Sequence, residues 1–478
     1  MAKYKIMIVG RQNEITILNQ RLDSAKSEFV ALYGRRRVGK TFLVKSVFEG
    51  KFTFQLTGVA QANFKDQLAN FNMAMRKQYP NKVTPNATSW MEAFRQISEV
   101  VEKSKQKKKV IFIDELPWFD TARSRFIQAL EHFWNSWASS RKDILLIVCG
   151  SAASWMINTL INNRGGLHNR ITQRMKIEPF TLRECEDFLN SKKISFPKYH
   201  VIRLYMVLGG IPFYWDEIKK GLSASQNIDQ LCFEPNGFLV GEFNKLFKSL
   251  FAKAERHEAI VMALAKKSKG LTREEISAET KLPTGGSLTQ LLEELEESGF
   301  IRKYIPFGKK ERNSLYQLGD FFSLFHTKFI KGQKRFDKNH WEKMVDNPKQ
   351  KAWSGYAFEQ VCLTHSEQIK KALGISGVST EESAWKSTQS KDGAQIDLVI
   401  DRRDGVINLC EMKFSTDLFT IDKKYDSELR NKVEAFRAET HTKKALFLTM
   451  ITTYGLKGNS YSLNVQNDLK MDVLFEIL

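Results

Sequence analysis

The sequence predicts an α/β protein that begins with a parallel sheet covered by helices and continues into two smaller folded regions. Three short, nearly continuous apolar runs at residues 29–33, 110–113 and 144–149 read as buried parallel strands. Helical segments at residues 91–104 and 123–138 lie between them, and strands that alternate with helices form parallel sheets. With 478 residues, the chain is long enough for about three domains.

Composition and charge narrow the class of protein. Hydrophobic residues make up 42% of the chain, which is enough for folded cores and argues against disorder. The net charge of +20 suits a polyanionic partner such as nucleic acid, or a membrane surface, with a solvated basic surface as the alternative. Five scattered cysteines without a C-x-x-C pair indicate reduced core thiols and a cytoplasmic protein. No run is long enough for a membrane span, so no membrane partner is expected, and self-association stays open.

The most specific motif is the loop at residues 34–41, which fits G-x-x-x-x-G-K followed by Ser or Thr. It lies between the first predicted strand and a helical run at residues 41–48. Its glycines let the backbone curl round phosphate oxygens, and the helix points its positive end at the same anion. Lys40 can then reach the β- and γ-phosphates of a nucleotide, and the Thr41 hydroxyl can hold Mg²⁺. The alternative is a glycine turn that binds nothing. The nucleotide-binding residues expected here are Gly34, Arg35, Arg36, Arg37, Val38, Gly39, Lys40, Thr41 and Phe42.

Polar residues follow the second and third predicted strands, at the sheet edge where α/β proteins place ligands. Asp114 and Glu115 end the second run, and Ser151 lies at the tip of the third. Asp114 would support Mg²⁺, and Glu115 would polarise the water that attacks the γ-phosphate. Ser151 is placed to sense that phosphate. The alternative is an acidic helix cap, in which Asp114 or Glu115 accepts hydrogen bonds from backbone amides.

These motifs resemble an ATPase family found mainly in archaea and in some bacteria, within the AAA+/STAND group of P-loop ATPases. The resemblance implies ATP as the nucleotide, Ser151 as the first sensor, and Pro212 as the contact of a helical lid that distinguishes ATP from ADP. It places Arg170 where its charge could reach a γ-phosphate in the same or a neighbouring molecule, with an ordinary surface arginine as the alternative. A loop at Arg11 would cover the adenine. The matching residues are Gly10, Arg11, Glu14, 34–41, Asp114, Glu115, Gly150, Ser151, Asn169, Arg170 and 209–212.

The middle of the chain predicts a winged-helix-like domain, with three helices followed by a two-stranded hairpin. The helices are expected at residues 257–267, from 272 and at 287–298, and the strands at 300–305 and 314–318. The third helix carries four glutamates and no lysine or arginine, and carboxylates would face DNA phosphates unfavourably. This pattern favours a scaffold or regulatory role over sequence-specific DNA reading.

A hairpin near the C-terminus gathers three charged residues. Two apolar runs at residues 395–400 and 406–413 flank an Asp-Gly turn. If the loop is residues 403–405, Asp397 and Glu411 lie opposite each other, and Lys413 shares their face. Two opposed carboxylates repel unless a cation such as Mg²⁺ lies between them, and Lys413 could then orient a phosphate. The alternative is a solvated face of Glu–Lys pairs.

These three residues, with Glu359 on a preceding helix, resemble the PD-(D/E)xK restriction-endonuclease-like fold. Ile396 stands where a proline usually precedes the aspartate. The resemblance implies a Mg²⁺ site at Glu359, Asp397 and Glu411, with Lys413 as a catalytic residue; an inactive form of the fold is the alternative. The expected function is an ATP-hydrolysing switch coupled to a Mg²⁺-dependent DNA nuclease, and the alternative is a non-catalytic, nucleotide-dependent regulator that binds DNA or protein without cleavage.

The predicted order of domains follows from these motifs. An α/β P-loop ATPase core with a parallel sheet is followed by a helical lid, a winged-helix-like domain, a linker and a small α/β restriction-endonuclease-like domain. The catalytic candidates are Glu115, Arg170 and Lys413, and the metal candidates are Thr41, Asp114, Glu359, Asp397 and Glu411. The five ranges are 1–180, 181–235, 236–330, 331–350 and 351–478.

Overall fold

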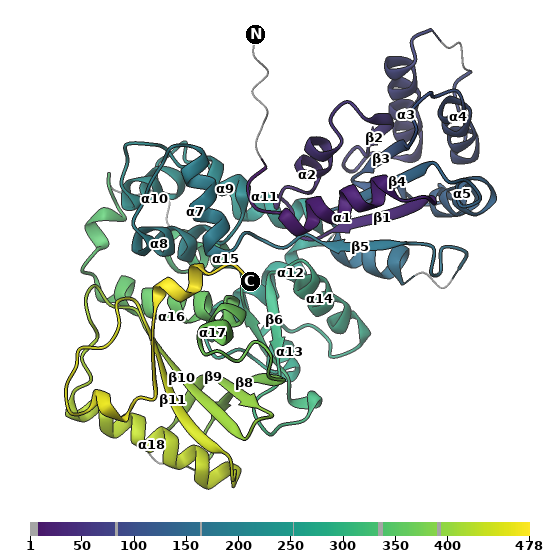
Figure 1. Ribbon diagram of the computed structural model, residues 1–478. Helices are drawn as coiled ribbons and strands as arrows, with labels where there is room; N and C mark the ends of the chain where they lie inside the picture. Colours follow the sequence, from purple (N-terminus) through teal and green to yellow (C-terminus); the bar gives the residue numbers. More distant parts are fainter. Residues whose placement is uncertain (1–7, 82–84, 163–164, 252, 333–337, 390–392) are drawn as a thin grey trace. The chain divides into compact units, whose positions relative to one another are not determined.

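The computed structural model describes residues 8–81, 85–162, 165–251, 253–332, 338–389 and 393–478 (Figure 1). The chain forms two compact units. The first comprises Met1–Pro179 with Leu246–Ala254 and Glu293–Ser298, and the second comprises the remaining segments Phe180–Lys245, Glu255–Leu292 and Gly299–Leu478. The predicted lid, hairpin and C-terminal regions therefore fold largely within one unit.

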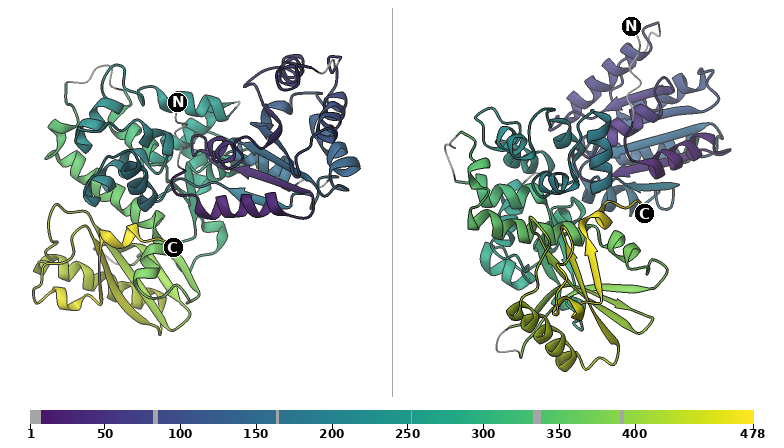
Figure 2. Two further views of the ribbon diagram at one scale, coloured as in Figure 1. Left: turned by 45° about the horizontal axis from the view of Figure 1, so that its top comes forward. Right: turned by 60° about the vertical axis from the view of Figure 1, so that its left-hand side comes forward.

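The first unit is built on a parallel sheet of five strands in the order β2-β3-β4-β1-β5. Every neighbouring pair of its strands is parallel, which confirms the predicted sheet. The central strands are buried because helices lie against both faces of the sheet (Figure 2). The strands are β1 Glu28–Tyr33, β2 Phe52–Thr57, β3 Lys109–Asp114, β4 Ile144–Gly150 and β5 Gln173–Lys176.

Aromatic side chains pack the helices of the first unit onto this sheet. On one face, Phe54 of β2 contacts Phe71 of α3 at 5.9 Å between ring centroids, and Phe71 contacts Trp90 of α4. On the other face, Phe48 after α2 contacts Phe52, whose ring stacks on Phe112 of β3 at 5.8 Å. The helices are α1 Gln12–Asp23, α2 Lys40–Val47, α3 Phe64–Gln78, α4 Trp90–Glu102, α5 Phe126–Phe133 and α6 Ala153–Trp155, with η1 Leu116–Phe119, η2 Trp134–Ala138 and η3 Met156–Ile161.

The helices of the predicted lid open the second unit and contain the predicted break. Helix α8 ends at Leu208, and α9 begins at Pro212, whose fixed φ suits the first helical position. Gly209 has a φ of 59°, and a Cβ on Gly210 would lie 1.9 Å from the Phe180 carbonyl oxygen. The sharp break is therefore confirmed. The lid helices are α7 Leu182–Ser191, α8 Lys198–Leu208, α9 Pro212–Asp216 and α10 Ala224–Cys232; α11 Glu242–Leu250 follows them and passes from the second unit into the first.

The middle of the chain has the element order that the sequence predicts. Thr272 caps α13 and forms a reciprocal capping box with Glu275, as the Thr-x-x-Glu spacing predicts. Strands β6 and β7 pair antiparallel, and Leu271 forms an isolated bridge with Tyr316 of β7. Whether this order is a winged-helix domain stays a prediction. The elements are α12 Ala254–Ala265, α13 Arg273–Thr280, α14 Gly286–Glu297, β6 Ile301–Tyr304, η4 Glu311–Asn313 and β7 Leu315–Leu318.

The C-terminal region folds around a mixed sheet of five strands in the order β12-β11-β10-β9-β8. Strands β8, β9 and β10 are antiparallel neighbours, whereas β10, β11 and β12 are parallel (Figure 1). Helix α18 crosses over between β10 and β11, as a parallel connection requires. The elements are α16 Pro348–Thr364, α17 Ser366–Ala372, β8 Thr380–Lys386, β9 Gln395–Arg402, β10 Val406–Lys413, α18 Lys423–Thr440, β11 Ala445–Thr452, η7 Ser462–Asn464, β12 Asn467–Lys470 and η8 Met471–Phe475.

The β9–β10 hairpin has the predicted register. Pairing runs from Ile407 and Asp401 to Cys410 and Leu398, so it is symmetric about residue 404. The loop of residues 403–405 ends at Gly405, whose φ of 89° suits a three-residue hairpin loop. The next two positions in the same register are Glu411 and Asp397.

The β6–β7 hairpin packs against this C-terminal sheet. The Phe307 amide, just after β6, donates to the Ala384 carbonyl oxygen of the edge strand β8 at 2.8 Å. The Phe307 ring lies 5.0 Å from that of Phe436 on α18. These contacts make the start of the hairpin loop part of the C-terminal core, which supports the scaffold role predicted from the four glutamates.

The described part of the predicted linker is packed rather than extended. Trp341 is buried, and its amide donates to the Asp229 carboxylate of α10 at 2.6 Å. Its ring contacts those of Phe325, Phe329 and Trp353. Residues 333–337 of the predicted linker lie outside the described residues. The short elements here are α15 Phe321–Phe325, η5 His326–Ile330 and η6 Glu342–Met344.

Two predictions from composition have counterparts in the structure. All five cysteines are buried, and none of them forms a disulfide, as their apolar surroundings predict. Across the part of the chain that the structure describes, no helix is long and apolar enough to cross a membrane.

A buried histidine joins the lid to the C-terminal region within the second unit. The Leu182 amide of α7 donates to His365 Nε2 at 3.0 Å. His365 Nδ1 lies 2.8 Å from the Val361 carbonyl oxygen, which can only accept, so Nδ1 carries the proton of a neutral ring. Burial lowers the pKa of His365 to about 4.

This imidazole is expected to make the second unit lose stability as the pH falls from about 6.5 to 4. The folded pKa of about 4 lies below the unfolded value of 6.5, so between these values the unfolded state binds more protons. The free energy of unfolding then falls by on the order of 3 kcal/mol over this window and levels off below it. Urea unfolding at stepped pH measures the loss. His365→Asn, which retains a donor for Val361, should flatten the profile, and an unchanged slope would contradict this assignment.

Candidate functional site

The phosphate-binding loop follows β1, and only glycine fits two of its positions. Gly34 has a φ of 131°, and a Cβ there would lie 2.5 Å from the Ile177 carbonyl oxygen. Gly39 has a φ of 90° and stands at the N-terminus of α2. The sequence motif therefore corresponds to a real backbone constraint, because an L side chain at either position would strain the loop.

Lys40 closes this loop on itself. Its ammonium donates to the carbonyl oxygens of Gly34 and Arg35, both at 2.8 Å. The side chain is buried, and burial lowers its pKa, although Cys149, Glu115 and Asp114 act in the opposite direction. A positive charge so placed is within reach of a phosphate that the loop amides cradle.

Thr41 and Asp114, the two predicted Mg²⁺ residues of this site, are hydrogen-bonded to each other. The Thr41 hydroxyl donates to the Asp114 carboxylate at 2.9 and 3.1 Å to its two oxygens. Asp114 is buried, which raises its pKa, while the hydrogen bond from Thr41 lowers it. Hydroxyl and carboxylate oxygens are the ligands that Mg²⁺ prefers, so these residues fit the ion that accompanies a nucleotide.

Glu115 and Ser151 also come together, although they lie on different strand ends. The Ser151 hydroxyl donates to Glu115 Oε1 at 2.8 Å, and its amide lies 3.3 Å from Oε2. Glu115 has a left-handed backbone with a φ of 51°. Ser151 therefore fixes the carboxylate that the sequence predicts to polarise the attacking water.

Arg11 contacts the phosphate-binding loop from the N-terminal side. Its guanidinium donates to the carbonyl oxygens of Val38 at 3.3 Å and Glu178 at 2.5 Å, and it pairs with Glu14 at 3.2 Å. These bonds give Arg11 a role in holding the loop, which sequence reasoning did not identify. The predicted contact with adenine stays a prediction. Of the other loop residues, Arg35 is buried, Arg36 and Arg37 are half-buried, and Phe42 is exposed.

The structure does not bring Arg170 to this site within the first unit. Arg170 is exposed and precedes β5, whose first residue, Gln173, pairs with Val30 near the start of β1. The phosphate-binding loop follows the opposite end of β1. A contact of Arg170 with a γ-phosphate would therefore involve a neighbouring molecule. Pro212 belongs to the second unit, and its predicted nucleotide contact stays a prediction.

The predicted C-terminal site gathers residues from α16, β9 and β10. Glu359 lies on α16, Asp397 on β9, and Glu411 and Lys413 on β10. Burial raises the pKa of Glu359 to about 8, the Asp397 carboxylate and then Glu411 add to this rise, and Lys413 opposes it. Helix α16 packs on β10, and Tyr425 contacts both Glu411 and Lys413.

Glu411 is already paired within the chain. Lys432 Nζ lies 2.5 Å from Glu411 Oε1, and the Tyr425 hydroxyl donates to Oε2 at 3.3 Å. Lys413 Nζ lies over the Tyr425 ring, 4.9 Å from its centroid, while Asp397 accepts from Gln395. Among the residues with described positions, no group of three or more His, Cys, Asp or Glu side chains could hold a metal ion. The carboxylates have the right chemistry for Mg²⁺ but do not fit it in this arrangement.

Sequence reasoning missed the residues that surround these carboxylates. Tyr425 and Lys432 are two helical turns apart, which places them on one face of α18, but nothing in the sequence links that face to Glu411. Arg302 of β6 donates to Gln317 of β7 at 2.9 Å, and Gln317 donates to the Tyr356 hydroxyl of α16 at 3.3 Å. Burial lowers the pKa of Arg302, and the charge of Asp397 is among the influences that raise it.

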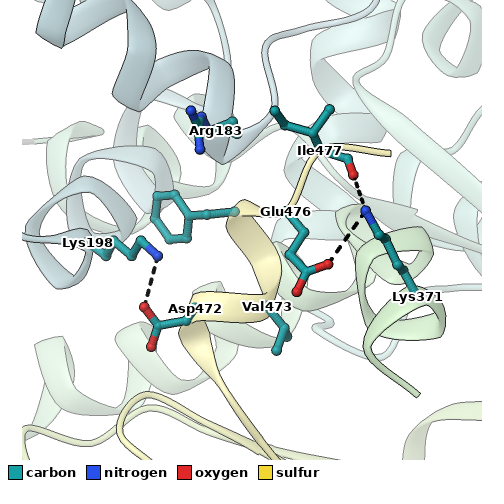
Figure 3. A pocket seen from close by; sticks show the side chains of 8 residues that line it. Arg183, Lys198, Lys371, Asp472, Val473, Glu476 and Ile477 are labelled. Carbon is teal, nitrogen blue, oxygen red and sulfur yellow. Dashed lines mark hydrogen bonds and ion pairs between the residues drawn. The ribbon is translucent and has the colours of Figure 1, made fainter. Parts of the chain in front are cut away.

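An open pocket of about 450 Å³ lies elsewhere in the second unit (Figure 3). Its charged residues pair across it: Lys198 contacts Asp472 at 2.9 Å, and Lys371 bonds the Ile477 carbonyl oxygen and pairs with Glu476. The pocket contains none of the predicted site residues. Its ion pairs join α8 and α17 to the C-terminal segment. The lining residues are Arg183, Lys198, Lys371, Asp472, Val473, Phe475, Glu476 and Ile477.

One family model matches the first part of the chain. Residues 8–218 match a family described as an ATPase domain predominantly from Archaea. An uncharacterized protein of Methanocaldococcus jannaschii is 28% identical over 333 residues, which are 68% of this chain and 69% of that protein. An uncharacterized ATP-binding protein of the same organism is 44% identical over 46 residues, 10% of this chain and 78% of that protein.

Two solved structures align with part of this chain. A Walker-type ATPase of Pyrococcus abyssi has a TM-score of 0.48 at 18% identity and covers 67% of this chain and 96% of its own. The ORC2 protein of Aeropyrum pernix, in complexes with ADPNP and ADP, has a TM-score of 0.40 at 15% identity and covers 67% of this chain and 93% of its own. The family match to residues 8–218 includes the whole phosphate site and ends before the C-terminal carboxylates.

Proposed function

From the archaeal-type P-loop ATPase domain that residues 8–218 form, we propose that this chain is an ATP-hydrolysing switch coupled to a DNA nuclease-like module. The observation that carries the ATPase half is the joint placement of Lys40, the Thr41–Asp114 pair and the Glu115–Ser151 pair around one loop. This arrangement supplies a cation for the phosphates, oxygen ligands for their Mg²⁺ and a carboxylate for the attacking water.

Each of these residues has a distinct task in hydrolysis. The loop amides and the N-terminus of α2 bind the phosphates, and Lys40 offsets their charge. Thr41 and Asp114 would hold the Mg²⁺ that accompanies the nucleotide and neutralises charge on its oxygens. Glu115 orients and polarises the attacking water, and the Ser151 hydroxyl keeps the carboxylate in place.

The nuclease half of the proposal rests on the hairpin register and on the charges near Glu359. Carried one position beyond Cys410 and Leu398, the register would set Asp397 opposite Glu411, and Lys413 is two residues further along β10. In a nuclease, Glu359, Asp397 and Glu411 would bind Mg²⁺, and Lys413 would position the scissile phosphate. The net charge of +20 supports DNA as the substrate. In the described part of this structure, these carboxylates are not arranged to bind a metal ion.

The pairing of Glu411 with Lys432 favours a second candidate function. In this alternative, the C-terminal module binds DNA or a protein without cleavage, and the ATPase acts as a nucleotide-dependent switch or drives self-association. A carboxylate neutralised by a lysine of its own chain needs no metal ion. The alternative predicts that ATP changes the size of the assembly and that neither Mg²⁺ nor Mn²⁺ supports cleavage.

Plasmid DNA offers the test that separates these candidates. The full chain with ATP and Mg²⁺ or Mn²⁺ is expected to nick supercoiled DNA, and Asp397→Asn should lower the rate by at least about 100-fold because it removes the charge of a metal ligand. Asp401→Asn is the matched control, since Asp401 lies on the same strand and pairs with Lys444. Cleavage that survives in Asp397→Asn would place the activity elsewhere. An inactive wild type would leave the regulator as the function.

A further inference from the structure

Helix α18 presents two donors to the two oxygens of a single buried carboxylate. Lys432 Nζ lies 2.5 Å from Glu411 Oε1, and the Tyr425 hydroxyl donates to Oε2 at 3.3 Å. Glu411 is only 6% exposed, and Lys432 is 23% exposed. The ammonium and the hydroxyl therefore take both oxygens that a divalent cation at Asp397 and Glu411 would use.

The Glu411–Lys432 ion pair has further charged side chains around it. Lys413 lies over the Tyr425 ring, so a second ammonium stands close to the first pair. Charges shielded from water interact strongly and are little screened by salt. A divalent cation that approached Glu411 would be attracted by the carboxylates of the site and repelled by the two lysines, and it would have to displace Lys432 from Glu411 or share the carboxylate with it.

We propose that Lys432 is a tethered counter-ion that competes with a divalent cation for Glu411 and keeps the C-terminal site closed to metal. This inference rests on the proposed nuclease-like site, because it names the residue that controls cation entry there. The Lys432–Glu411 ion pair explains why carboxylates with the right chemistry for Mg²⁺ are not arranged to bind it among the described residues. Any change that moves α18 away from β10 would open the site.

Calorimetric titration of the full chain with Mn²⁺, in the absence of nucleotide, tests the competition. The Asp397→Asn variant is titrated in parallel. Only the heat of Mn²⁺ binding that is lost in this variant is assigned to the C-terminal site. Lys432→Gln is expected to bind Mn²⁺ at this site at least about 10-fold more tightly than the wild type, because the competing charge is gone. Lys444→Gln is the matched control: it removes an ion pair with Asp401 at another point of the same sheet and should leave the affinity unchanged.

A charge-preserving variant covers the case in which Lys432→Gln does not fold. Lys432→Arg retains the ion pair and grips a carboxylate with two N–H groups, so it should bind Mn²⁺ no more tightly than the wild type. Two results would overturn the proposed competition: tighter Mn²⁺ binding by Lys432→Arg, or equal Asp397-dependent binding by the wild type and Lys432→Gln. Neither result would contradict the nuclease proposal. If neither the wild type nor a folded Lys432→Gln shows Asp397-dependent binding, the metal site itself is refuted.

Discussion

Glu115→Gln is expected to lower the rate of ATP hydrolysis by about 10²- to 10³-fold while nucleotide binding is retained. The amide has nearly the shape of the carboxylate but cannot take a proton from the attacking water. Ser151 Oγ can still donate to the amide oxygen, whereas the longer hydrogen bond from the Ser151 backbone amide to Oε2 is lost. Phosphate release under saturating ATP measures the rate, and a fluorescent nucleotide measures binding.

Ser151→Ala is expected to have a smaller effect on ATP hydrolysis than Glu115→Gln. It removes the hydroxyl that orients Glu115 and leaves the carboxylate, so a loss of about 10-fold, between wild type and Glu115→Gln, is expected. Hydrolysis at the wild-type rate in Glu115→Gln would show that another group activates the water. Loss of nucleotide binding in the same variant would show that the substitution disturbs the phosphate-binding loop.

Lys40→Ala is expected to abolish the stabilisation of the protein by ATP and Mg²⁺. A ligand at 100 times its dissociation constant stabilises the folded state by about 2.7 kcal/mol, so a variant with much weaker binding loses nearly all of this. The loss arises because Lys40 supplies the buried cation of the loop. Thermal melting with ATP, ADP and no nucleotide measures the effect.

Lys51→Ala provides the control for charge alone, since Lys51 is exposed and lies after α2 in the same unit. It should show the full nucleotide-dependent shift of the wild type. A wild type that ATP does not stabilise would contradict nucleotide binding at this loop. A shift that persists in Lys40→Ala would mean that the amides of the loop and α2 bind the phosphates without the lysine.

Local signals in the sequence predicted much of the fold. The glycine positions of the phosphate-binding loop, the Thr272–Glu275 capping box and the helix break at residues 209–212 each depend on residues close together in the chain. The hairpin register is also local, because the turn at residues 403–405 fixes which residues oppose each other. The parallel sheet followed from apolar runs that alternate with helical segments.

Contacts between distant residues could not be predicted in this way. Lys432 is 21 positions from Glu411, and their pairing depends on how α18 packs across β10. Trp341 looked like part of a linker because its neighbours are basic, yet its ring fills a gap between distant aromatic side chains. Arg170 matched a family pattern, but its distance from the phosphate-binding loop depends on the register of β5, which follows it, with β1.

Helix α8 connects the helix break to the ends of two strands within the second unit. At its start, Tyr199 stacks on Phe414, directly after Lys413, with centroids 5.2 Å apart, and on Tyr454 at 5.7 Å. At its other end, 11 residues or about 16 Å away, it runs into Gly209 and the turn toward Pro212. A tilt of α8 would therefore displace the residues that follow β10 and β11. A movement at the turn before Pro212 would in this way reach Phe414, the residue next to Lys413.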